Sequence, residues 1–149
     1  NTFGLRAYYR PTQFSRISLE YHTTNEFRRG GNKFDLQPHE TDITEQTKHI
    51  IKVVDDDDVF FNEYKHKLSV YASAQHTDRN SYYGADKAEN AYGKTKDLTA
   101  VGGAMYVGNM DNCLFSPATF TGGLEYQYNS LHDVMTGYGR DLKQDVKIA

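Results

Sequence analysis

Hydrophobic and polar residues alternate along most of this chain with a period of two. The clearest case is TFTGGLEYQYN, residues 119–129. Its even positions from Phe120 to Tyr128 are apolar, aromatic or glycine, and its odd positions are polar or glycine. A β-strand sends successive side chains to opposite faces, so this segment predicts a strand with one apolar and one polar face. The same alternation occurs in residues 15–26 and 67–77.

Across the whole sequence, this period predicts seven strands in one segment, residues 1–149. The predicted strands are residues 5–11, 15–26, 49–61, 66–79, 98–109, 119–130 and 144–149. The predicted long loops are residues 27–48, 80–97 and 131–143. We therefore expect an all-β fold, an antiparallel meander of about six to eight long strands with long loops.

The connections between the predicted strands alternate between short and long. Bacterial outer-membrane barrels have short turns at one end and long loops at the other. Seven strands are too few for a closed barrel, for which about eight are needed. The pattern therefore predicts a partial segment of a transmembrane β-barrel, with apolar faces toward lipid and polar faces toward the lumen.

The amino-acid composition favours β-strands, is compatible with a membrane protein and argues against a nucleic-acid partner. Twelve Tyr, eight Phe and twelve Gly favour β-structure over helix. A barrel strand crosses a bilayer with about 9 to 11 alternating residues, so a mean hydropathy of −0.76 does not exclude a membrane protein. A net charge of −3 offers no concentrated basic surface, so we expect no nucleic-acid partner.

Three long stretches carry a resemblance to a known family. They are LEYHTTNEFRRGGNKFDLQPHETDITEQ, YKHKLSVYASAQHTDRNSYYG and FTGGLEYQYNSLHD. These segments resemble the barrel portion of TonB-dependent outer-membrane receptors from Bacteroides-like bacteria, and the resemblance covers residues 5–139. The resemblance implies a receptor of about 22 strands with a plugged lumen. Such a receptor takes up a scarce nutrient: a siderophore, haem, cobalamin or a glycan.

The resemblance also implies a location and partners. The chain would lie in the outer membrane of a Gram-negative cell, in contact with lipid and with a nutrient ligand. Energy would come from the TonB complex through parts of the family that match nothing in this sequence, namely the N-terminal plug and the TonB box. As a fragment with open sheet edges and apolar faces, the chain is expected to self-associate.

The run Asp55–Asp58 departs from the family's pattern. In a strand, two of its carboxylates would face lipid, where charge is destabilising. Either the run lies near an aqueous edge, or residues 50–60 do not span the membrane. A calcium site is a weaker interpretation than a solvated acidic turn, because the EF-hand spacing is missing.

No catalytic, metal or cofactor site is predicted. The six histidines are scattered without metal-binding spacing, and the three GG pairs lack the context of a phosphate loop. Ligand contacts are expected instead from aromatic and basic residues of the long loops, because Tyr offers stacking surface and Arg binds carboxylates. These residues are Phe27, Arg28, Arg29, Phe34, Tyr82, Tyr83 and Tyr92. They could equally pack the loops together or form an interfacial aromatic girdle.

A second hypothesis is a self-contained soluble β-sandwich or barrel, such as an adhesin-like or carbohydrate-binding module. Its apolar faces would form an ordinary core, with Leu124, Tyr126 and Tyr128 buried against a second sheet. Whether these three side chains are buried in a core or face lipid distinguishes the two hypotheses.

Overall fold

The computed structural model describes residues 1–30, 35, 43–63, 65–84 and 88–149, and nearly all of them lie in β-strands. The strands are β1 (Thr2–Tyr9), β2 (Ser15–Gly30), β3 (Ile43–Phe61), β4 (His66–Gly84), β5 (Tyr92–Cys113), β6 (Ser116–Met135) and β7 (Arg140–Ile148). Two short 3₁₀ turns, η1 (Glu89–Ala91) and η2 (Thr136–Tyr138), precede β5 and β7. No helix in this part of the chain is long and apolar enough to cross a membrane.

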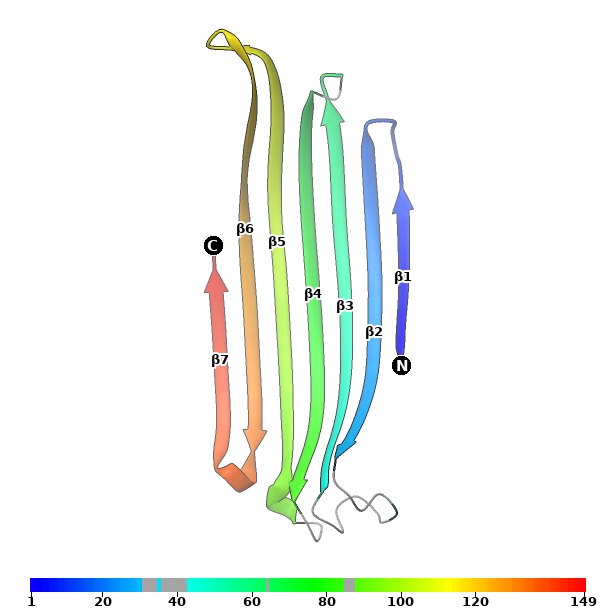
Figure 1. Cartoon of the computed structure of the whole chain (residues 1–149), viewed down its shortest axis with the longest axis vertical. Helices are drawn as coiled ribbons and strands as arrows, with labels where there is room; N and C mark the ends of the chain where they lie inside the picture. The colour runs from blue at the N-terminus through cyan, green and yellow to red at the C-terminus, as the bar shows by residue number, and fades with distance from the viewer. Residues whose placement is uncertain (31–34, 36–42, 64, 85–87) are drawn as a thin grey trace.

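The seven strands form one antiparallel sheet in the order of the sequence, β1 to β7. Each strand pairs with the next, whereas β1 and β7 each have one neighbour, so the sheet is open (Figure 1). The hairpin turns that join β1 to β2, β3 to β4 and β5 to β6 lie at one end of the sheet, and η1 and η2 lie at the opposite end (Figure 1). The predicted all-β antiparallel meander is confirmed.

The strands are longer than the hydrophobic alternation predicts. Of the predicted loop 27–48, residues 27–30 belong to β2 and 43–48 to β3. The predicted loops 80–97 and 131–143 are likewise largely taken up by β4, β5, β6 and β7. The reason is that the backbone pairing of the strands continues into stretches where both faces are polar, because polar side chains there form hydrogen bonds from one strand to the next. In such a stretch, the apolar alternation disappears although the strand does not.

Two of the hairpin turns use left-handed backbone at residues other than glycine. Asn62 and Glu63 have φ values of 52° and 55°, and Leu114 and Phe115 have 46° and 79°. Positive φ at both central residues, as at Leu114 and Phe115, is typical of the two-residue turns whose twist matches that of the flanking strands. The second turn is closed by Cys113 paired with Ser116.

The hairpin turns also step along the sheet in one direction (Figure 1). Tyr9, the last paired residue of β1, lies in the same row as Val70 of β4, four residues from the end of that strand at His66. His66 in turn shares a row with Phe120 of β6, four residues from the end of that strand at Ser116. Each hairpin therefore reaches further than the one before it.

Candidate functional site

One face of the sheet carries a continuous apolar band across the middle of the strands. On β5 it runs from Leu98 to Tyr106, and on β6 from Phe120 to Tyr128, with Ala104 directly opposite Leu124. Its large side chains are exposed: Leu124 is 75% exposed. Other exposed members are Phe3, Leu5, Tyr9, Ile17, Leu19, Val59, Leu68, Val70 and Tyr126. The described residues thus leave this face without a cover.

At the hairpin end, the band finishes in a row of rings from four neighbouring strands. The ring centroids of Phe61 and His66 are 5.2 Å apart, and those of His66 and Tyr106 are 6.0 Å apart. Tyr106 is also 6.2 Å from Phe120 on β6. The Tyr106 hydroxyl and His66 Nδ1 lie 2.8 Å apart in a hydrogen bond. These contacts fix an aromatic border along one edge of the apolar face.

The acidic run lies inside strand β3. Asp55 is paired with Leu19 and Ala72, in the middle of the apolar band. Asp57 lies on the same face, two residues nearer the hairpin end. Its Oδ1 is buried without a hydrogen-bond partner in the described chain. Asp58 points to the opposite face. The run is therefore not a solvated turn, because β3 continues through it to Phe61.

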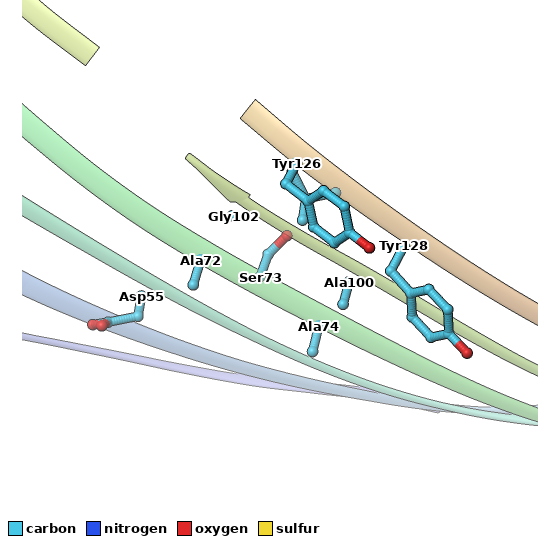
Figure 2. Close-up of a pocket in the computed structure, with 9 residues that line it drawn as sticks. Asp55, Ala72, Ser73, Ala74, Ala100, Gly102, Tyr126 and Tyr128 are labelled. Atoms are coloured by element: carbon cyan, nitrogen blue, oxygen red, sulfur yellow. The ribbon is translucent and has the colours of Figure 1, made fainter. Parts of the chain in front are cut away.

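Small residues next to Asp55 leave a shallow groove in the apolar face. Alanine and glycine from β4 and β5 form its floor, with Tyr126 and Tyr128 of β6 along one side and Asp55 at the other (Figure 2). Its volume is about 360 Å³. The floor residues are Ala72, Ala74, Ala100 and Gly102.

The other face holds the buried polar groups of the sheet. Asp58 is 4% exposed, and its carboxylate contacts Arg16 Nη2 at 2.9 Å, Lys67 Nζ at 3.0 Å and the Ser69 hydroxyl at 2.7 Å. The other buried polar side chains on this face are Ser18, Ser69, Ser81, Thr95 and Asp133. We call this surface the polar face. Apart from Met135, its buried side chains form hydrogen bonds or are polar, whereas the large side chains of the apolar band are exposed.

A second network joins four strands at the end of the sheet away from the short hairpin turns. The Thr95 hydroxyl donates to Asp133 Oδ1 at 2.6 Å and accepts from Arg79 Nη2 at 2.9 Å. Asp133 also pairs with Arg140 Nη2 of β7 at 2.5 Å. Thr95 lies in the predicted loop 80–97, so the sequence pattern missed this network. No apolar alternation marks these residues.

Glycine permits one contact that crosses a whole strand. The Tyr71 hydroxyl of β4 donates to Glu125 Oε2 of β6 at 2.6 Å and passes over Gly103 of β5. A Cβ at Gly103 would lie 2.5 Å from the Tyr71 hydroxyl oxygen and 2.9 Å from the Leu124 carbonyl oxygen.

At the hairpin end, a hydrogen bond from Lys65 to Asp111 raises the pKa of Lys65.

The structure places six of the seven predicted ligand-contacting residues in strands rather than loops. Phe27 is 59% exposed on β2, and the Arg28 guanidinium pairs with Glu26. Tyr82 is 1% exposed, with its ring 4.8 Å from that of Tyr92, so these two pack together. The remaining candidates are Arg29 on β2 and Tyr83, which is 42% exposed on β4. Phe34 lies outside the described residues. Their role in ligand contact stays a prediction.

Within the described part of the chain, no group of three or more His, Cys, Asp or Glu side chains is arranged to hold a metal ion. No protein-family model matches the chain, and neither a curated protein nor a solved structure matches it.

Proposed function

We propose that this chain forms part of the wall of a transmembrane β-barrel in the outer membrane of a Gram-negative cell. The apolar band faces lipid and the polar face lines the lumen. The observation that carries the proposal is the distribution of burial between the faces: Leu124 is 75% exposed, whereas Asp58 is 4% exposed. A soluble protein buries its apolar face, because removing apolar surface from water is the main force in folding.

The length of the apolar band supports this proposal. Leu98 to Tyr106 on β5 covers nine residues, as does Phe120 to Tyr128 on β6. At about 3.4 Å per residue, eight steps give about 27 Å along the strand, or about 21 Å along the membrane normal for a tilt of about 40°. Barrels of this class carry a lipid-facing band about 25 Å tall.

Three further features support a barrel wall. Girdles of aromatic residues flank the lipid-facing band of membrane barrels, and the rings of Phe61, Tyr106 and Phe120 form such a row at the hairpin end. The stepping of the hairpin turns is the stagger that a tilted barrel requires. Lumen-facing ion pairs such as Arg16–Asp58 suit a water-filled or plugged interior.

We assign the parent barrel to nutrient uptake as a TonB-dependent receptor, with a siderophore, haem, cobalamin or glycan as cargo. This assignment is supported by the family resemblance of residues 5–139. The chain itself would contribute wall and recognition surface, not catalysis. Contact with the TonB complex would use other parts of such a receptor.

Fractionation of the source cells tests the proposal. An antibody against this chain should detect a band several times larger than 17.0 kDa in the outer-membrane fraction, resistant to an alkaline carbonate wash. Its amount should rise when the cells are starved of the cargo, which is found by removing iron, haem, cobalamin and glycans in turn. A 17 kDa band in the soluble fraction would overturn the proposal and support the soluble binding module.

A further inference from the structure

Three arginines gather on the polar face at the first hairpin. Arg6 lies on β1, Arg10 follows the end of that strand, and Arg16 lies on β2. They border two adjoining hollows of about 330 Å³ and about 230 Å³, and both hollows include Arg10 and Arg16. The larger hollow is lined by Arg6, Tyr8, Arg10, Arg16 and Ser18. We call the two hollows together the arginine groove.

The alternation of β1 explains why these side chains meet. Residues two apart in a strand point to the same face, so Arg6, Tyr8 and Arg10 follow one another along the edge of the sheet. Tyr8 is paired with Ser18 on β2, and Arg16 lies two residues further toward the turn. The guanidinium groups therefore approach the groove from both strands.

The positive charge of the groove is only partly neutralised. Arg6 Nε contacts Glu20 Oε1 at 2.8 Å, and Arg16 Nη2 contacts Asp58 Oδ2 at 2.9 Å. Arg10 forms no ion pair with any residue that the structure describes. A guanidinium group has five N–H donors. All five donors of Arg10 are therefore available to a ligand, and Arg6 and Arg16 each keep several.

We propose that the arginine groove binds a small anion that carries two or more oxyanion groups, either phosphates or carboxylates. Arg10 would hold one oxyanion through two parallel hydrogen bonds, the geometry for which arginine is best suited. Arg6 and Arg16 would hold the second oxyanion through donors that Glu20 and Asp58 leave unused. The combined space suits a ligand of this size, since small-molecule sites begin at about 300 Å³.

This site does not depend on the proposed barrel, because the groove lies on the polar face in any surroundings of the apolar face. The chain as a whole has a net charge of −3, which opposes rather than favours unspecific binding of anions. Binding of an anion would therefore indicate a local site.

Isothermal titration of the chain in a neutral detergent, at about 0.15 M salt, tests the groove with pyrophosphate and with citrate. We expect submillimolar binding of at least one anion, and the one that binds identifies the oxyanion as phosphate or carboxylate. Arg10→Gln should weaken binding about tenfold or more, and Arg10→Lys should lie between it and the unchanged chain, because lysine keeps the charge and loses the fork.

Arg140→Gln is the matched control. It removes the same charge from β7, at the opposite edge and the opposite end of the sheet, where Arg140 pairs with Asp133. We expect it to leave binding unchanged. Far-ultraviolet circular dichroism should show the same strand content in all variants, since Arg10 lies outside the ladder. Absence of binding of both anions up to about 10 mM, or equal weakening by Arg140→Gln and Arg10→Gln, would overturn the inference.

Discussion

Asp57 and Asp58 are adjacent in the sequence, but their replacement should change the stability of the sheet in opposite directions. Asp58 lies on the polar face and is 4% exposed, with three partners within 3.0 Å. Asp57 lies on the apolar face, where its Oδ1 is buried and unpaired within the described chain. The two variants to compare are Asp58→Ala and Asp57→Ala.

The expected magnitudes follow from the partners of each carboxylate. Loss of the Ser69 hydrogen bond costs about 1 kcal/mol. The pairs with Arg16 and Lys67 contribute about 1 kcal/mol each, because those side chains are 43% and 33% exposed and return partly to water. Asp58→Ala should therefore lower the free energy of unfolding by about 2 to 3 kcal/mol.

For Asp57→Ala we expect the free energy of unfolding in lipid to rise by about 1 kcal/mol. Removing a lipid-facing charge relieves a penalty that is smaller for Asp than the ~2–4 kcal/mol of Lys or Arg at the bilayer midplane. The assay is urea unfolding of the chain in phosphatidylcholine vesicles, followed by circular dichroism. With a slope of about 2 kcal/mol/M, the midpoint should fall by about 1 to 1.5 M for Asp58→Ala and rise by about 0.5 M for Asp57→Ala. Shifts of the same sign would refute the assignment of the two faces.

Four further substitutions test separate parts of the structure by the same unfolding assay. Leu124→Lys should destabilise the lipid-bound sheet by about 2 to 4 kcal/mol. Glu125→Lys, on the other face, should have little effect beyond the loss of the hydrogen bond between Glu125 and Tyr71. Equal effects of the two substitutions would contradict the assignment of the two faces. Thr95→Val should cost about 1 to 2 kcal/mol, because the buried Asp133 carboxylate loses a donor, and an unchanged midpoint would exclude that network from stability. Glu63→Gly should stabilise by about 1 kcal/mol by relieving its φ of 55°, and a loss of stability would show that this turn is unstrained.

The alternation of the sequence predicted the strands and their faces, because each predicted strand has an apolar side. It placed Leu68, Val70, Ala72 and Ala74 on one face, as the register with β5 confirms. It did not predict the strand ends, since polar residues on both faces leave no period to detect. Thr95 shows this limit, because its place in β5 depends on partners in β4 and β6.

The arginine groove and the second turn could not be predicted either. Arg10 and Arg16 meet only through the pairing of β1 with β2, and sequence spacing does not give that register. Leu114 and Phe115 form a tight turn without the glycine or asparagine that usually marks one. Both features depend on which strands become neighbours.

The most direct test of the account compares spin labels at positions 124 and 125 of the chain in phosphatidylcholine vesicles. Each label is attached to a single cysteine, with Cys113→Ser as the background, and its collisions with oxygen and with a water-soluble nickel complex are measured. A label at position 124 should collide mainly with oxygen, which concentrates in lipid, and one at position 125 mainly with nickel. Shielding of position 124 from both reagents would contradict the account, because it would place Leu124 in the core of a soluble protein.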